Sequence, residues 1–178
     1  YKRQIMYLKT AGSVLVIAAS TWLGCLMGRE LYERLDRLST MKRIFLVIRQ
    51  EILYSGMPLF EVFGNVSKRF EDPYKTWMLA LEHRAKERNE GGFMEIWKDS
   101  LYQYLGTHGW QKKDLETLEG LGMEMAGMDR EELVKVLELY IERLEWKVED
   151  GKKEMGQKNR IFRSLGLMGG IFAVVLLL

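Results

Sequence analysis

Charged residues are absent from two long stretches of the chain, residues 10–28 and residues 164–178. The first has nineteen residues, which as a helix extend about 28 Å, close to the ~30 Å hydrocarbon thickness of a bilayer. The second stretch can be counted from Ile161, because the long side chain of Arg163 lets its charge reach the headgroups. Counted in this way, it extends about 27 Å as a helix. The pattern therefore predicts one transmembrane helix at residues 10–28 and another at residues 164–178. A short leader, residues 1–9, precedes the first of them.

Other interpretations of the two ends stay open at this point. The second stretch also fits a buried C-terminal helix of a soluble domain. Residues 1–25 also fit a signal peptide, and Leu23-Gly24-Cys25 is a weak match to a lipoprotein cleavage site. Trp22 and Leu23 suit such a site poorly, and no flexible tether follows Cys25. If residues 1–25 are such a signal, the protein is an exported or lipid-anchored helical adaptor.

Basic residues beside the two stretches predict their orientation, because such residues gather on the cytoplasmic side of membrane helices. Five follow the first stretch, six precede the second and three precede the first: these are Arg29, Arg34, Arg37, Lys42 and Arg43; Lys147, Lys152, Lys153, Lys158, Arg160 and Arg163; and Lys2, Arg3 and Lys9. We therefore expect residues 29–163 to be cytoplasmic and both termini to lie outside. If the natural chain starts at Met6, only Lys9 precedes the first stretch, and the excess of basic residues after this stretch becomes larger.

Residues 29–163 carry apolar side chains at helical spacing throughout. A long stripe directly follows the first uncharged stretch, and a second long one leads into the other; shorter stripes lie between them. The members are Leu31, Leu35, Leu38, Phe45, Ile48 and Ile52; Leu59, Val62, Phe63, Val66 and Phe70; Trp77, Met78 and Leu81; Phe93, Ile96, Trp97, Leu101, Tyr104 and Leu105; Leu115, Leu118, Leu121 and Met125; and Leu133, Leu137, Tyr140, Leu144 and Val148. The fold is predicted to be all-α, a bundle of about six helices.

Glycine, proline and a capping residue mark the predicted helix boundaries. Ser55-Gly56-Met57-Pro58 ends the first helix, since Gly suits a helix C-terminus and Pro suits the first turn of the next helix. Asp72-Pro73, residues 89–92 and residues 106–109 mark later boundaries. Asp129 is a predicted N-cap, with a glutamate three residues further on.

Charge and motif content exclude several classes of function. Residues 29–163 hold 24 of the 27 Lys and Arg residues and all 25 Asp and Glu residues, so this region is nearly neutral and unlike a nucleic-acid surface. His83 and His108 have no cysteine near them, whereas a zinc site needs three or four converging ligands. The sequence has no phosphate-binding loop and no nucleophile elbow. We expect no enzyme activity, no cofactor, no metal and no nucleic-acid partner.

Glycines four residues apart occur in both uncharged stretches. They are Gly24 and Gly28 in the first, and Gly166 and Gly170 in the second. Small residues at this spacing allow membrane helices to approach closely. We expect these glycines to pack the two helices against each other or against other subunits.

Four segments give the chain a resemblance to a known family. They are Ser20-Thr-Trp-Leu-Gly24, Glu51-Ile-Leu-Tyr-Ser-Gly-Met-Pro-Leu59, Leu121-Gly122 with Met128-Asp-Arg-Glu131, and Ser164-Leu-Gly-Leu-Met-Gly-Gly170. With them, the chain resembles the stage III sporulation protein AB family of endospore-forming bacteria nearly from end to end. The leader is longer than the family pattern, and Met57 and Met128 replace residues that are often small or polar there.

The resemblance implies a non-enzymatic membrane platform. Members of the family are similar to a reduced inner-membrane platform protein of type II secretion and type IV pilus machines, whose cytoplasmic modules are six-helix bundles. They act in the mother-cell membrane surrounding the forespore, within a transenvelope complex. The implied partners are a cytoplasmic secretion-type ATPase, other membrane subunits of the channel, the lipid bilayer and further copies of the same chain.

Two charged segments are candidates for partner docking. In the corner from Glu51 to Leu59, we expect Gly56 and Pro58 to turn the chain and Tyr54 to pack against the corner; a docking edge is the alternative role. The start of the last long helix is expected to act first as a cap and then, through Arg130 and Glu131, as a contact for a basic partner. If these two residues dock, alanine at both should leave thermal stability nearly unchanged.

Overall fold

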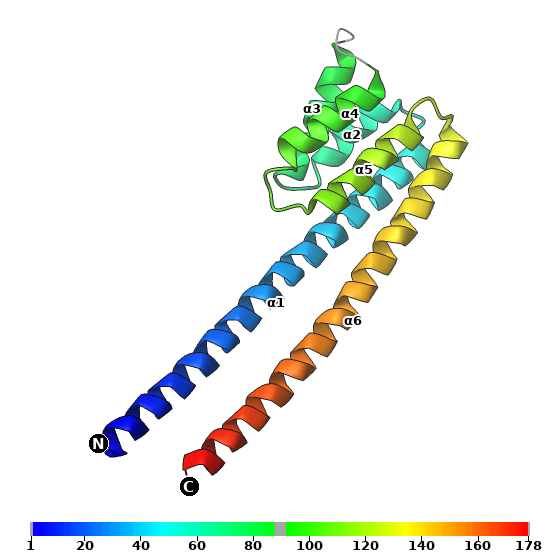
Figure 1. Cartoon of the computed structure of the whole chain (residues 1–178). Helices are drawn as coiled ribbons and strands as arrows, with labels where there is room; N and C mark the ends of the chain where they lie inside the picture. The colour runs from blue at the N-terminus through cyan, green and yellow to red at the C-terminus, as the bar shows by residue number, and fades with distance from the viewer. Residues whose placement is uncertain (1, 88–91, 178) are drawn as a thin grey trace. The chain divides into compact units, whose positions relative to one another are not determined.

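The protein, as a computed structural model, is built of helices joined by loops. The structure describes the backbone of residues 2–87 and 92–177, and the side chains of Trp22, residues 29–87, residues 92–157 and Ile161. Within these residues there are six helices and no strand (Figure 1): α1 (Lys2–Ser55), α2 (Leu59–Ser67), α3 (Tyr74–Lys86), α4 (Phe93–Tyr104), α5 (Lys112–Met125) and α6 (Arg130–Leu177). The predicted all-α fold is confirmed.

The chain divides into two compact units, each described by itself. The smaller one contains α1 up to Leu35 and α6 from Glu149 onward, and the other consists of residues 36–148. In the first of these, a Cβ added at Gly151 would overlap the side chain of Leu35. Glycine at this position therefore allows the two long helices to approach closely.

The unit of residues 36–148, called the bundle below, encloses a continuous apolar core to which every helix contributes. The largest fully buried side chains include Phe45 of α1, Phe63 of α2, Trp77 of α3 and Trp97 of α4. Buried residues of α5 and α6 complete the core: Leu115, Leu118, Leu121, Met125, Leu133, Leu137, Tyr140, Ile141, Leu144 and Val148. The stripes predicted from the sequence thus supply most of the core.

One predicted stripe extends too far. Phe70 was expected on the same helical face as Phe63, but α2 ends at Ser67. Phe70 lies half-buried in the following loop, with the Arg43 guanidinium 5.8 Å from the centre of its ring. Packing against α1, rather than helical periodicity, therefore determines where this ring lies.

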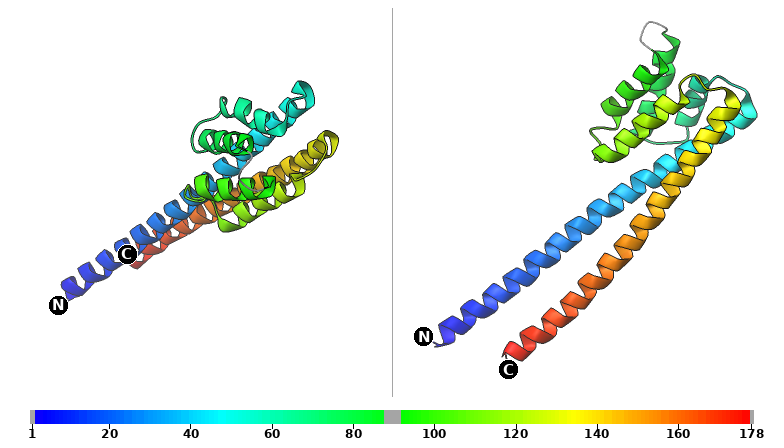
Figure 2. Two further views of the ribbon diagram at one scale, coloured as in Figure 1. Left: turned by 90° about the horizontal axis from the view of Figure 1, so that it is seen from above. Right: turned by 45° about the vertical axis from the view of Figure 1, so that its right-hand side comes forward.

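The helices α2 to α5 follow one another in space as they do in the chain, with consecutive helices in contact (Figure 2). Trp97 lies where they converge, with its ring centre 5.2 Å from Trp77 and 5.9 Å from Phe93. Its indole N–H donates to the carbonyl of Leu118 at 2.9 Å. A Cβ at Gly122 would overlap the Trp97 ring, so α4 and α5 touch at a place where a glycine is needed.

Within the bundle, the last part of α1 lies beside the first part of α6, as Figures 1 and 2 both show. Ion pairs join Lys42 to Glu145 and Arg49 to Glu138, each at 2.9 Å. The edge of one ring of the Phe45–Tyr140 pair meets the face of the other, with ring centres 5.6 Å apart. These contacts bring the C-terminus of α1 next to the N-terminus of α6.

Candidate functional site

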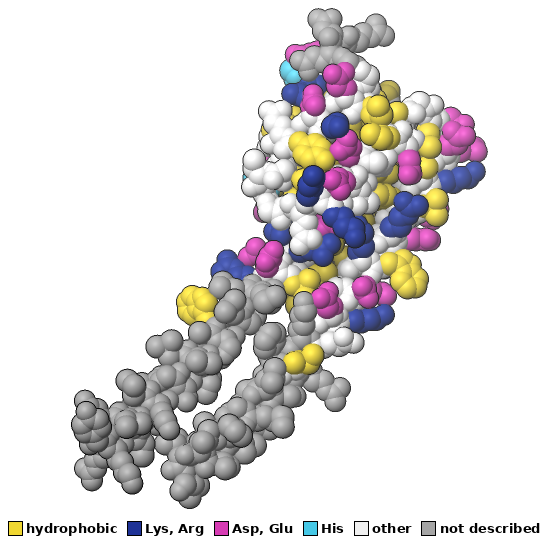
Figure 3. Space-filling model, in the orientation of Figure 1, with side chains coloured by type: hydrophobic (Ala, Val, Ile, Leu, Met, Phe, Trp, Pro, Cys, Tyr) yellow, Lys and Arg dark blue, Asp and Glu magenta, His cyan; other side chains and the backbone are white. Residues whose placement is uncertain are grey.

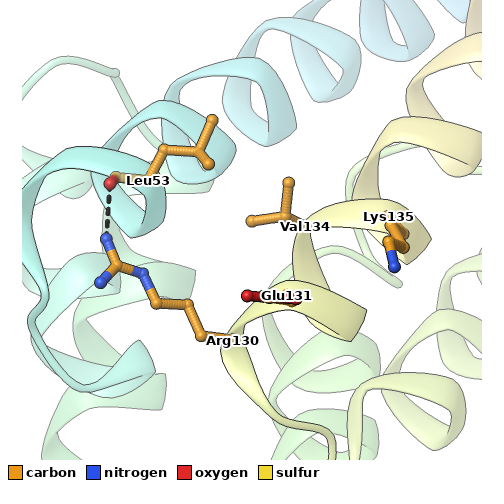
Figure 4. Close-up of a pocket in the computed structure, with 5 residues that line it drawn as sticks. All are labelled: Leu53, Arg130, Glu131, Val134 and Lys135. Atoms are coloured by element: carbon orange, nitrogen blue, oxygen red, sulfur yellow. Dashed lines mark hydrogen bonds between the residues drawn. The ribbon is translucent and has the colours of Figure 1, made fainter.

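The end of α1 and the start of α6 form one corner of the bundle, called the α1–α6 corner here. Figure 4 shows part of it at close range. The residues that build it come from Leu53 to Gly56 and from Asp129 to Lys135, two segments far apart in the sequence. Two of the four candidate docking residues, Arg130 and Glu131, lie inside it side by side.

The chain reverses sharply after α1. Gly56 has a φ of +65°, in the left-handed region that glycine adopts without strain. The Ser55 hydroxyl donates to the carbonyl of Glu51 at 2.6 Å and accepts from the Met57 N–H at 3.3 Å. Pro58 then immediately precedes α2. The turn predicted from Gly56 and Pro58 is confirmed.

The start of α6 is fixed in a similar way. Gly127 has a φ of +79°, which lets the chain turn after α5. An oxygen of the Asp129 carboxylate accepts from the Glu132 N–H at 2.9 Å. This is the helix-capping bond expected from the sequence.

Arg130 links the start of α6 to the last turn of α1. Its guanidinium donates a hydrogen bond to the backbone carbonyl of Leu53, in the last turn of α1 (Figure 4). The last four carbonyls of a helix have no partner within the helix, and a cation there also offsets the negative end of the helix dipole. Arg130 therefore caps α1 from the first residue of α6.

A shallow hollow of ≈ 480 Å³ opens between the two helix ends. Leu53 and Val134 form its apolar sides, and Figure 4 shows their side chains directed toward one another. Arg130 and Glu131 lie on one side of Val134, whereas Lys135 lies on the other. The hollow thus offers apolar surface bordered by charges of both signs.

Tyr54 does not pack against the corner, and that expectation is wrong. Its side chain is 87% exposed, and neighbouring Leu53 is 41% exposed. Tyr54 follows the buried Ile52 by two residues, which turns it about 200° away from the core-facing side of the helix. The aromatic side chain of Tyr54 therefore points to solvent, and it does not line the hollow.

Glu51, the fourth candidate, faces a different neighbour. Its carboxylate pairs with Arg69, just after α2, at 2.6 Å. The Arg69 side chain is largely exposed, so the pair lies at the surface and adds little to stability. Glu51 thus contacts the loop after α2 and does not line the hollow.

Sequence reasoning missed the apolar sides of the hollow and one of its charges. Leu53 and Val134 each directly follow a core residue, so helical periodicity places them about 100° off their stripes. The signal that the sequence offered for these two positions was an apolar residue just outside each stripe. The pairing of α1 with α6 is what brings Leu53, Val134 and Lys135 to one hollow.

The predicted membrane segments lie almost wholly outside the described side chains. Among the side chains that the structure describes, no helix has a stretch long and apolar enough to cross a membrane. Gly24, Gly28, Gly166 and Gly170 lie outside these residues, and their packing role stays a prediction. Of residues 10–28 and 164–178, only Trp22 has a described side chain, and it is 71% exposed.

These features define an all-α protein whose helical bundle presents an exposed apolar and charged corner. Residues 9–178 match the model of the family described as stage III sporulation protein AB. The chain therefore belongs to the stage III sporulation protein AB family, as its sequence segments suggested. It is a sporulation protein by family.

Individual relatives agree with this assignment. The chain is 24% identical over 171 residues to stage III sporulation protein AB of Bacillus subtilis (strain 168), covering 96% of this chain and 99% of the relative. A solved structure of a stage III sporulation protein AB has a TM-score of 0.61 and 21% identity, covering 70% of this chain and 97% of that one. At this identity the solved structure supports the helical fold alone.

Proposed function

We propose that this chain is a non-enzymatic membrane scaffold of the transenvelope complex between mother cell and forespore. In this role its bundle docks the cytoplasmic secretion-type ATPase of the same complex. Membership of the sporulation family supports the setting. The bundle would face the mother-cell cytoplasm, as the basic residues beside the two uncharged stretches indicate.

Helix continuity supports a scaffold that transmits force. α1 runs from Lys2 to Ser55 and α6 from Arg130 to Leu177, each as one helix. Each therefore joins a proposed span, residues 10–28 or 164–178, to the bundle by unbroken helical backbone. A push on the bundle would reach the membrane along these two helices. In the membrane, the paired glycines would pack against other subunits or a further copy of the chain.

The observation that carries the docking role is the exposure of Tyr54. A tyrosine that is 87% exposed beside a partly exposed leucine leaves a large amphipathic ring without packing partners. Tyrosine is enriched among the residues that dominate binding energy at protein interfaces. Its position at the α1–α6 corner places this ring on a rigid, capped helix end.

Binding of the purified ATPase to the full-length chain in nanodiscs tests this function. Tyr54→Ala should weaken binding by at least about tenfold, which is the effect of losing an interface anchor. Trp146→Ala is the matched control, because Trp146 is an aromatic residue of α6 that is 72% exposed outside the corner. Failure of the wild-type chain to bind the ATPase, or equal loss in both variants, would contradict docking at this corner.

A further inference from the structure

Helix α6 carries two large apolar side chains on the side that faces away from the core. Leu139 is 56% exposed and Trp146 is 72% exposed. Each follows a buried core residue, Leu137 or Leu144, by two positions, which turns it about 200° from the core. One heptad separates the two exposed residues, so they lie on one line along the helix, about 10 Å from each other. Apolar residues repeated at this spacing are typical of a helix that packs against another helix.

Four charged side chains lie close to this apolar line. They are Glu132, Lys135, Glu142 and Arg143, and all four are exposed. None of them forms an ion pair among the residues that the structure describes. In Figure 3, hydrophobic side chains lie among basic and acidic ones along the right-hand edge of the bundle, where α6 runs. These four residues and the two apolar ones are called the outer α6 face below.

Opposite charges lie on opposite sides of the apolar line. Helical geometry places Glu142 and Arg143 about 50° to either side of it, at nearly the same height along the helix. Lys135 and Glu132 lie about 30° to either side, one turn apart. Lys135 is on the side of Glu142, and Glu132 is on the side of Arg143. Each side of the line therefore carries one acid and one base, in the reverse order of the other side.

We propose that the outer α6 face is the contact between two copies of this chain, whose α6 helices lie parallel and side by side. About a two-fold axis along the helices, Leu139 and Trp146 each meet the same residue of the second copy. One side of the apolar line then faces the other side of the second copy's line. Glu142 thereby faces Arg143 of the second copy, and Lys135 faces its Glu132. By symmetry each of these pairs forms twice.

The order of the charges selects this arrangement. An antiparallel pair that buries both apolar residues of each copy is centred between Glu142 and Arg143. It would place Glu142 against Glu142 and Arg143 against Arg143, and like charges brought together at an interface are repelled. A purely acidic or purely basic segment of another protein would likewise meet like charges at half of the four positions. A parallel second copy matches all four.

The parallel arrangement agrees with the proposed membrane anchoring, because copies held in one membrane by the same two ends have the same polarity. The face is smaller than a standard interface, which has about 20–30 residues a side. Confinement of the copies to one membrane raises their effective concentration and favours association through a small face. The inference goes beyond the proposed function, since it requires no ATPase. With one copy per nanodisc, the Trp146→Ala control of ATPase binding stays independent of this association.

Reversing one charge at a time tests the pairing. Energy transfer between full-length copies in lipid vesicles, labelled at the N-terminal amine with donor or acceptor, measures their association. Glu142→Arg and Arg143→Glu each place like charges across the axis, so each should raise the dissociation constant about tenfold or more. A mixture of the two variants restores opposite charges at both positions and should associate within about threefold of the wild type. A wild type that does not associate, or a mixture no tighter than either variant alone, would overturn the proposal.

Two further chains control for net charge. The double variant Glu142→Arg with Arg143→Glu keeps the wild-type net charge and should recover wild-type association. Glu95→Arg makes the same reversal at an exposed residue of α4 and should change the dissociation constant less than about twofold. A loss in Glu95→Arg as large as that in Glu142→Arg, or no recovery in the double variant, would overturn the proposal. Circular dichroism of every variant checks that it remains helical.

Cysteine cross-linking tests the register of the two helices. In a Cys25→Ser chain in vesicles, Leu139→Cys and Trp146→Cys should each form a disulfide-linked dimer on oxidation, because each meets its own counterpart. Met123→Cys is the matched control, since Met123 is 50% exposed on α5, and its yield should be at least about fivefold lower. Equal yields at all three positions, or cross-links only between 139 and 146 in a mixture, would overturn the parallel arrangement. The ATPase is absent from these experiments, so failure of ATPase docking leaves their outcome unchanged.

Discussion

Arg130, the first residue of α6, donates a hydrogen bond to the carbonyl of Leu53 in the last turn of α1. The structure thereby gives Arg130 an internal role, in addition to any docking role. Arg130→Ala should lower the free energy of unfolding by about 1 kcal/mol, the usual net value of such a bond. Glu131→Ala should change it by less than about 0.5 kcal/mol, as is normal for an exposed side chain. Thermal unfolding of the detergent-solubilised chain measures both, and equal stabilities of the two variants would argue against this cap.

Two glycines of α5 should respond in opposite ways to alanine. Gly122 lies against the buried ring of Trp97, so Gly122→Ala forces overpacking and should cost about 1–3 kcal/mol. A Cβ at Gly120 would meet nothing within 4 Å. Gly120→Ala should therefore stabilise the helix by up to about 1 kcal/mol. Denaturant titration compares the two, and destabilisation by both would contradict the described α4–α5 contact.

Glu119 should make stability depend on pH in the acid range. Its carboxylate accepts hydrogen bonds from Lys98 at 2.7 Å and from the Tyr102 hydroxyl at 2.9 Å, which hold the pKa of Glu119 below its usual value. Because the pKa is lower in the folded protein, the stabilisation is complete above the unfolded pKa of about 4.3 and is lost as the pH falls through the folded pKa.

The matching variant is Glu119→Gln, which cannot ionise. The difference in melting temperature between wild type and Glu119→Gln should be larger at pH 7 than at pH 3. Melting curves at the two pH values provide the measurement. A difference that is the same at both would show that ionised Glu119 does not contribute.

Tyr140 has a buried hydroxyl that makes no hydrogen bond among the described residues. Burial raises the pKa of this hydroxyl, which therefore stays protonated. Tyr140→Phe keeps the edge contact with Phe45 and removes an unsatisfied polar atom, so it should leave stability unchanged or raise it by up to about 1 kcal/mol. Tyr140→Ala should cost about 3–5 kcal/mol by opening a cavity. Chemical denaturation distinguishes these outcomes, and a large loss in Tyr140→Phe would reveal an unrecognised partner of the hydroxyl.

Helix identity and burial were largely predictable because they depend on local spacing. The fully buried Trp77, Met78 and Leu81 lie on the predicted face of α3. Gly56 and Asp129 mark helix ends through backbone conformation and capping, which act over a few residues. Such signals do not require knowledge of the distant parts of the chain.

The details of the candidate site depended on long-range pairing. The bond from Arg130 to Leu53 joins residues 77 positions apart, and no local pattern specifies it. The same holds for the contact of Trp97 with Gly122, which explains physically why the Leu121-Gly122 segment contains a glycine. Tyr54 was placed wrongly although its spacing from Ile52 already directed it away from the core.

We propose that the chain is anchored in the membrane around the forespore and that its bundle faces the mother-cell cytoplasm. The deciding measurement is protease accessibility of residues 29–163 in sporulating cells whose plasma membrane has been opened while the forespores remain sealed, with a fully lysed control. If the bundle faces the mother-cell cytoplasm, these residues are digested as soon as the plasma membrane is opened. Protection until the forespore membranes are also opened would contradict this orientation and would instead favour an exported or lipid-anchored helical adaptor.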